Sequence, residues 1–176
     1  VLIGTNPRFE ATMVNARIRK AYLDNHTKII SINDIGDLTY EYDFLDGKTQ
    51  TIKDIVENNN EVSKKIIDSK KPMIILGESF FNTKSANYLF HSLKKFLKEN
   101  NKITDEWNPL NILSTDAATG GKFDVDIVKM KDNLIEDLKG NKFELIYLLG
   151  QDNLDFNKKN EFVIYQGSHG DKGAEI

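Results

Sequence analysis

The sequence of 176 residues contains no cysteine. This excludes disulfides, iron–sulfur clusters with cysteine ligands, zinc sites built on cysteine and a thiol nucleophile from this stretch of chain. Histidine is also scarce: three residues are scattered along the sequence, which argues against a dedicated metal site.

Several further signals are missing. No apolar run approaches the roughly 20 residues that span a bilayer, and there is no signal-peptide pattern. No block of lysine and arginine carries interleaved aromatics, so the sequence does not point to nucleic acid as a partner. The motifs GxGxxG, GxxxxGK[ST] and HExxH and a Ser–His–Asp set are all absent, so no catalytic residue is identified. With 39% hydrophobic and 29% charged residues and a net charge of -3, the composition indicates a folded globular domain.

Short apolar runs that stop at glycine are the clearest regularity. Continuous apolar runs are typical of strands buried on both faces, as in parallel sheets. The four runs are Val1–Gly4, Met73–Gly77, Leu145–Gly150 and Phe162–Gly167. Two more candidate strands are Lys28–Ile32 and Leu110–Leu113.

Helical patterns alternate with these runs. Helix-period apolar positions begin at Phe9, where Phe9/Met13/Ala16 and Val14/Ile18/Ala21 form two stripes. The other predicted helices are Thr51–Asn58, Glu61–Lys70, Thr83–Asn101 and Asp126–Gly140. In Thr83–Asn101 the apolar face is expected to contain Tyr88, Leu89, Leu93, Phe96 and Leu97. The alternation predicts an α/β fold, a mostly parallel Rossmann-like layered sheet flanked by helices, in a single domain over residues 1–176.

One segment, Asp37–Gln50, interrupts the alternation with a Tyr-x-Tyr pair and an Asp-Gly turn. It is either an edge hairpin or an extended excursion over the end of the sheet. Ser114–Lys122 resembles a phosphate loop only superficially, because its Gly-Gly-Lys follows a polar linker and not a strand. Trp107 is expected to anchor the strand that follows it.

The turn Gly4–Arg8 raises the question of a bound anion. In a doubly wound sheet, ligands lie beyond the carboxyl ends of the strands. Asn6 suits a helix N-cap and Pro7 the first helical position, and free backbone donors beside Arg8 would be able to hold a phosphate. An ordinary βα turn explains the same residues without a ligand, and the residues alone favour that interpretation.

Two further clusters have a chemical and a structural interpretation. His169 and Asp171, in the segment Gln166–Glu175, would be able to do acid–base work, but no nucleophile accompanies them, and we favour a tight loop. The first predicted helix is basic, which fits either a solvated face or a contact with another subunit. Its basic residues are Arg8, Arg17, Arg19 and Lys20.

Several stretches resemble one protein family. They are "LIGTNPRFEATMVNARIRKAYL", "DLTYEYDFL", "KKPMIILGES", "WNPLNIL" and "FVIYQGSHGDKGAEI". They are similar to the C-terminal part of the G subunits, the large iron–sulfur subunits of proton-pumping NADH–quinone oxidoreductase (respiratory complex I). The resemblance implies that this stretch belongs to the molybdopterin oxidoreductase superfamily. The form seen here resembles an alphaproteobacterial, Rickettsia-like one.

The resemblance implies a structural module that has lost its pterin–nucleotide cofactor and performs no chemistry. It implies that iron–sulfur clusters lie in an N-terminal region outside this chain and that no cofactor or metal is held here. Residues matching the family motifs would line the relic of a cofactor cleft. They are Gly4, Thr5, Asn6, Pro7, Arg8, Gly167, His169 and Gly170.

The resemblance also sets expectations for the whole protein. We expect a piece of a longer chain, placed in the peripheral arm of the complex at the cytoplasmic face of the bacterial inner membrane. Its partners would be other peripheral-arm subunits, with neither nucleic acid nor direct membrane insertion. One alternative is a cofactor-binding fragment of an active molybdopterin enzyme, such as a formate dehydrogenase-like protein. Another is a small-molecule-binding α/β module without a redox partner.

Overall fold

The computed structural model describes residues 1–115, 119–125, 133–151, 154 and 159–168. The chain divides into two compact units, Val1–Thr119 (unit 1) and Gly120–Ile176 (unit 2). We describe each unit by itself, and the single domain expected over residues 1–176 stays a prediction.

A five-stranded parallel sheet forms the centre of unit 1, in the order β3-β2-β1-β4-β5. Its strands are β1 (Leu2–Ile3), β2 (Ile30–Ile32), β3 (Asp43–Leu45), β4 (Ile74–Gly77) and β5 (Leu110–Leu113). The predicted parallel α/β fold is confirmed. The chain moves outward from β1 to β3, crosses back to β4 and ends at β5, which is the order of a doubly wound nucleotide-binding fold.

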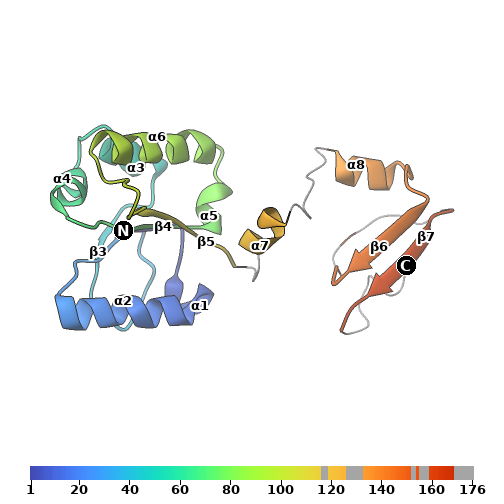
Figure 1. Ribbon diagram of the computed structural model, residues 1–176, viewed down its shortest axis with the longest axis horizontal. Coiled ribbons are helices and arrows are strands. Elements are labelled where there is room, and N and C mark those ends of the chain that lie inside the picture. The colour runs from blue at the N-terminus through green and yellow to red at the C-terminus, as the bar shows by residue number, and fades with distance from the viewer. Residues whose placement is uncertain (116–118, 126–132, 152–153, 155–158, 169–176) are drawn as a thin grey trace. The chain divides into compact units, whose positions relative to one another are not determined.

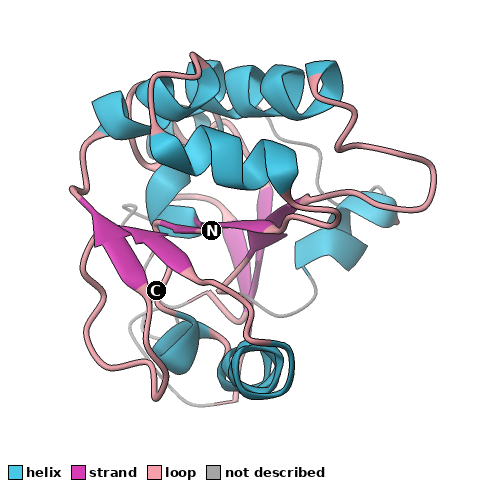
Figure 2. Cartoon of the chain, turned by 90° about the vertical axis from the view of Figure 1, so that its left-hand side faces the viewer, coloured by secondary structure: helices cyan, strands magenta, loops and turns pink. Residues whose placement is uncertain are grey.

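Helices cover both faces of this sheet (Figures 1 and 2). On one face lie α1 (Pro7–Glu10) and α2 (Thr12–Asn25). On the other face lie α3 (Thr49–Val56), α4 (Glu61–Asp68) and α6 (Ala86–Glu99), while the short α5 (Glu78–Phe81) follows β4 directly. Two apolar clusters result, one on each side of the sheet, because parallel strands bury both faces.

Helix α6 illustrates how the sequence pattern becomes packing. Leu89, Leu93, Phe96 and Leu97 are all buried, as their helical spacing predicts. Tyr88 was expected on the same face, and this was wrong: its side chain is 60% exposed. One residue step turns a helix by about 100°, so Tyr88 lies off the stripe that its neighbour Leu89 begins.

The connection from β2 to β3 contains no helix. Parallel strands are normally joined by a helical crossover of a dozen or more residues. Here an irregular segment, Asn33–Tyr42, takes the place of that helix, and fully buried Leu38 anchors it in the cluster beneath α2. β3 pairs with β2 in parallel, so the alternative of an edge hairpin was wrong.

Trp107 anchors the start of β5, as predicted. Its indole Nε1 donates to the carbonyl of Pro72 at 3.0 Å, which ties together the segments that lead into two neighbouring strands. The ammonium of Lys71 lies 5.4 Å from the centroid of the same ring.

Unit 2 contains a smaller parallel pair. Strands β6 (Leu145–Leu149) and β7 (Phe162–Gln166) pair over five residues each, and α8 (Leu134–Lys139) precedes them. Leu138, Ile146 and Leu148 form its buried cluster. Helix α7 (Thr119–Asp124), which begins at the last residue of unit 1, contains the Gly-Gly-Lys of the stretch that superficially resembles a phosphate loop. Among the described residues, no helix is both long and apolar enough to cross a membrane.

Candidate functional site

The strand order of unit 1 reverses between β1 and β4. In folds of this kind the ligand crevice opens at such a point, beyond the carboxyl ends of the two strands. Here these ends are Gly4, directly after β1, and Gly77, the last residue of β4. The geometry around these two glycines therefore decides whether a ligand can lie there.

Both glycines allow one backbone segment to approach another closely. A Cβ on Gly77 would lie 2.1 Å from the Gly4 carbonyl oxygen. Gly4 has a φ of +62°, and a Cβ there would lie 2.7 Å from the backbone nitrogen of Phe80. The Ser79 hydroxyl donates to the Gly4 carbonyl at 2.6 Å. The close approach thus joins the two turns to each other.

The turn after β1 has the local structure that the sequence predicts. Asn6 caps α1 by accepting from the Arg8 amide at 3.1 Å, and Pro7 is the first helical residue. The donors that a phosphate would need are bonded to the carboxylate of Glu10. It accepts from the Thr5 hydroxyl at 2.5 Å and from the backbone amide of Asn6 at 3.1 Å. The Glu10 side chain thus already accepts the hydrogen bonds that these two donors of the turn would offer to a phosphate.

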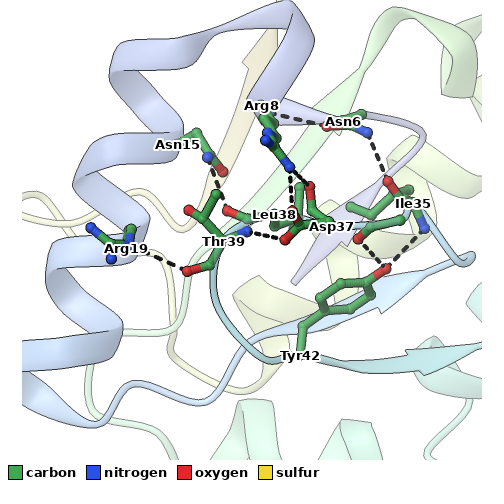
Figure 3. A network of polar contacts seen from close by, with 10 residues as sticks. Asn6, Arg8, Asn15, Arg19, Ile35, Asp37, Leu38, Thr39 and Tyr42 are labelled. Atoms are coloured by element: carbon green, nitrogen blue, oxygen red, sulfur yellow. Dashed lines mark hydrogen bonds and ion pairs between the residues drawn. The ribbon is translucent and has the colours of Figure 1, made fainter.

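Arg8 is also bonded within the protein (Figure 3). Its guanidinium donates to the Asp37 carboxylate at 2.6 Å and to the Asp37 carbonyl at 2.7 Å. The Thr39 amide, and after it Arg8, bond to the Asp37 carboxylate and lower its pKa. The side-chain Nδ2 of Asn6 donates to the Ile35 carbonyl at 2.8 Å, which fixes the turn to the same segment. Arg8 therefore stabilises the segment that replaces a helix.

A second carboxylate lies at the next pair of strand ends. Glu78, directly after β4, accepts from the Ser114 hydroxyl at 2.8 Å and from the Thr115 amide at 2.9 Å. The Thr115 hydroxyl donates to it as well, at 2.5 Å. The Thr115 hydroxyl and amide, together with Ser114, lower the pKa of Glu78. The ends of β4 and β5 are thereby joined through one side chain.

A pocket of about 310 Å³ remains beyond the ends of the strands. Its polar lining includes Thr5, Asn6 and Glu10, which already bond to one another, and Asn33 and Thr83. In the part of the chain that the structure describes, no three histidine, aspartate or glutamate residues gather as a metal site would require.

The second half of the predicted cleft belongs to unit 2. Gly167 directly follows β7 and crowds the ring of Tyr165: a Cβ there would lie 2.1 Å from the Tyr165 hydroxyl. His169, Gly170 and Asp171 lie outside the described residues. The predicted cleft that combines the two turns stays a prediction.

The basic residues of the first helices divide into two pairs. Arg8 bonds to Asp37, and Arg19 donates to the Thr39 carbonyl at 3.3 Å. Arg17 and Lys20 are exposed, and among the described residues neither has an ion-pair partner. The solvated-face interpretation fits the second pair, and a contact with another subunit stays a prediction.

The sequence did not identify the three carboxylates that accept hydrogen bonds from these turns, Glu10, Asp37 and Glu78. Glu10 lies four residues after Asn6, one position beyond the three-residue spacing of a capping box, and its carboxylate still reaches back to the Asn6 backbone amide. The sequence therefore carried only a partial signal for this contact. Asp37 and Glu78 bond to residues 29 and 37 positions away, and only the fold brings these partners together.

These features define the class of unit 1. It is a doubly wound α/β unit in which carboxylates of the chain itself, Glu10 and Glu78, accept hydrogen bonds from the turns that follow the strands. The model of the molybdopterin oxidoreductase family matches residues 1–176, so the chain belongs to that family.

Individual relatives share about a third of the residues. The chain is 37% identical, over its whole length, to an NADH-ubiquinone oxidoreductase 75 kDa subunit from Reclinomonas americana. Identity is 34% over 99% of the chain to an NADH dehydrogenase [ubiquinone] iron-sulfur protein 1 from Solanum tuberosum. It is 35% over the whole chain to an NADH-ubiquinone oxidoreductase 78 kDa subunit from Neurospora crassa. The chain spans 26%, 23% and 23% of the length of these relatives.

The first turn does not fit the phosphate of a nucleotide cofactor. Such a group needs free donors at the start of a helix, and here the Thr5 hydroxyl and the Asn6 amide already donate to Glu10. A phosphate would have to displace a carboxylate held by two hydrogen bonds, or lie beside it and be repelled.

Proposed function

We infer that this chain is a structural domain of the large iron–sulfur subunit of a proton-pumping NADH–quinone oxidoreductase. The whole complex transfers electrons from NADH to quinone, and this domain supports the part of the subunit that carries the iron–sulfur clusters. The domain itself binds no pterin cofactor and no metal.

The Glu10 carboxylate carries this proposal. It accepts hydrogen bonds from the Thr5 hydroxyl and the Asn6 backbone amide, in the turn where family members would hold a nucleotide phosphate. Asp37 forms an ion pair with the neighbouring Arg8. The full-length similarity to 75 and 78 kDa subunits supports the assignment to the complex. An active molybdopterin enzyme, such as a formate dehydrogenase-like protein, receives no comparable support, because its nucleotide would need these donors free.

Partners and location follow from the same proposal. The partners are other subunits of the peripheral arm, and the complex lies at the cytoplasmic face of the inner membrane of an alphaproteobacterium. The domain does not insert into the bilayer and reaches the membrane through its partners.

Purification of the full-length protein with an affinity tag tests the proposal. We expect NADH-dependent quinone reduction and the other peripheral-arm subunits to co-purify from detergent-solubilised membranes. An untagged strain provides the control for background. Co-purification of formate-oxidising activity, or of no redox partner at all, would contradict the assignment.

A further inference from the structure

An aromatic groove lies beside the end of α2, away from the strand ends described above. It has a volume of about 980 Å³, and its walls come from α2 and from the segment Gly36–Phe44. That segment includes the edge strand β3, so the groove follows the free edge of the sheet. We call it the edge groove.

The aromatic side chains of the edge groove are fixed in place. The Tyr40 hydroxyl donates to the Asn15 side chain at 2.7 Å, and the Tyr42 hydroxyl donates to Asp34 at 2.9 Å. The rings of Tyr22 and Tyr40 lie 6.0 Å apart between centroids, and those of Tyr42 and Phe44 6.5 Å. Because these rings are already ordered, a ligand that packs on them loses little of its binding free energy to ordering.

Phe44 and Glu41 leave the edge groove open to a partner. Phe44 is 59% exposed although it belongs to a strand. The Glu41 carboxylate is exposed and accepts one long hydrogen bond, from the Tyr22 hydroxyl at 3.4 Å. Both residues line the same groove. An aromatic ring and an available carboxylate in one groove suit a cationic side chain, which the ring attracts through its face and the carboxylate through its charge.

The segment that forms one wall of the groove is rich in carboxylates. From Ile29 to Asp46 the sequence contains no lysine or arginine. The same stretch contains the carboxylates Asp34, Asp37, Glu41, Asp43 and Asp46. Hydrogen bonds from the chain lower the pKa values of Asp34 and Asp37, so both are charged at neutral pH. Asp37, Asp43 and Asp46 form ion pairs with Arg8, Lys65 and Lys48, and Lys28 and His26 also line the groove. Among the described residues, Glu41 is therefore the groove-lining carboxylate that has no ion-pair partner.

We propose that the edge groove binds a lysine- or arginine-bearing segment of a partner subunit, with the cation at Glu41 and the stem of its side chain on Phe44. This deepens the proposed function and rests on it, since the partner is a subunit of the same complex. The basic pair Arg17 and Lys20 on α2 repels such a segment, which favours its entry from the β3 side.

Hydroxyl-radical labelling of the intact complex tests whether the groove is covered. Tyr88 on α6, 60% exposed, is the matched control for Phe44, 59% exposed. Each labelling rate is first divided by the rate of the same residue in the denatured protein. If a partner covers the groove, we expect the normalised labelling rate of Phe44 to be at least about fivefold lower than the rate that its exposure in the isolated chain predicts. A Phe44 rate that matches its 59% exposure would overturn the inference.

Photo-cross-linking identifies what covers the groove. With Phe44→p-benzoylphenylalanine in the assembled complex, we expect the captured peptide to come from another subunit and to contain lysine or arginine at the cross-link. Adding Glu41→Lys should lower the yield about tenfold, the loss expected at the centre of an interface. Glu57→Lys, on an exposed carboxylate that pairs with Lys53, is the matched control and should leave the yield unchanged.

A captured peptide from this same chain, or one without a basic residue, contradicts the inference. If the chain is absent from the complex, the proposed function fails as well. If the chain is present and Phe44 is open, only the groove assignment fails, so the two failures can be told apart.

Discussion

Glu10 is the residue on which the structure of the first turn depends most. Its carboxylate satisfies the hydroxyl of Thr5, a residue only 3% exposed, and the backbone amide of Asn6. A carboxylate near the start of a helix also interacts favourably with the helix dipole. The same feature that makes the turn unsuited to a phosphate therefore makes it stable without one.

Replacing Glu10 should destabilise the fold. Glu10→Ala leaves a buried hydroxyl without its acceptor, which costs about 1–2 kcal/mol in the free energy of unfolding. Urea titration measures this change. Glu57→Ala, which removes an exposed carboxylate paired with Lys53, should cost less than about 0.5 kcal/mol and serves as the control. Equal effects of the two substitutions would contradict the role given to Glu10.

Gly77 should tolerate substitution less well than another glycine of unit 1. Gly77→Ala places a methyl group 2.1 Å from a backbone oxygen, which cannot move without shifting β1, so we expect a loss of about 3 kcal/mol. Gly36→Ala is the matched control: φ is +73° there but no atom lies within 4 Å, so only conformational strain of about 1 kcal/mol applies. Thermal unfolding of both variants gives the comparison, and a Gly77→Ala variant as stable as Gly36→Ala would be inconsistent with direct packing of the two turns.

Among the elements, the segment Asn33–Tyr42 depends most on tertiary contacts. It carries no backbone ladder of its own and is fixed by the burial of Leu38, by Arg8 and by Asn15, whose amide donates to the Leu38 carbonyl at 3.2 Å. Figure 3 shows how these side chains converge on the segment. Side chains of α1 and α2 thus hold the segment, together with its own local hydrogen bonds, in which the Gly36 and Thr39 amides donate to the Asp34 and Asp37 carboxylates.

Truncating the anchor of this segment should release it. Leu38→Ala leaves a cavity beneath α2 and is expected to cost about 3 kcal/mol. Limited proteolysis should then cut within Asn33–Tyr42 before any other described loop of unit 1. Leu23→Ala, at a leucine that is 54% exposed on α2, should alter neither stability nor cleavage. Protection of the segment in the Leu38 variant would argue against its dependence on this anchor.

The contact between the ends of β4 and β5 should depend on pH. The pKa of Glu78 is lowered in the folded chain, so its contribution is complete above about pH 4.5, the ordinary value, and is lost as the pH falls through the folded-state pKa. We expect Glu78→Gln to be less stable than the unchanged chain at pH 7 and to lose less stability on acidification. Urea titrations at several pH values measure this. Parallel pH profiles for the two proteins would rule out the contribution.

The sequence predicted most elements and few of the contacts between them. Apolar runs ending at glycine identified β1, β4, β6 and β7, and helical stripes identified α3, α4 and α6, because periodicity and turn chemistry are local. The sequence marked an interruption at Asp37–Gln50 and offered an extended excursion as one alternative, but it could not show the bonds that hold the segment to α1 and α2. The N-cap at Asn6 was predictable for the same local reason, whereas the pairs Arg8–Asp37 and Glu78–Thr115 were not.

At the scale of the whole molecule, unit 1 combines the strand order of a nucleotide-binding fold with strand ends that bond to one another. Glycines let the turns after β1 and β4 meet, and Glu10 and Glu78 bond to the donors that remain. Such an arrangement preserves the architecture of the fold, while the Thr5 hydroxyl and the Asn6 backbone amide already donate to Glu10. It suits a domain whose task is to support its neighbours.

The content of molybdenum, tungsten and pterin in the purified full-length complex tests this account most directly. Elemental analysis by mass spectrometry, with fluorescence detection of oxidised pterin, measures both quantities in one preparation. The account predicts amounts far below one metal atom and one pterin per copy of the chain. A stoichiometric pair, with one molybdenum or tungsten atom and pterin per copy, would contradict it.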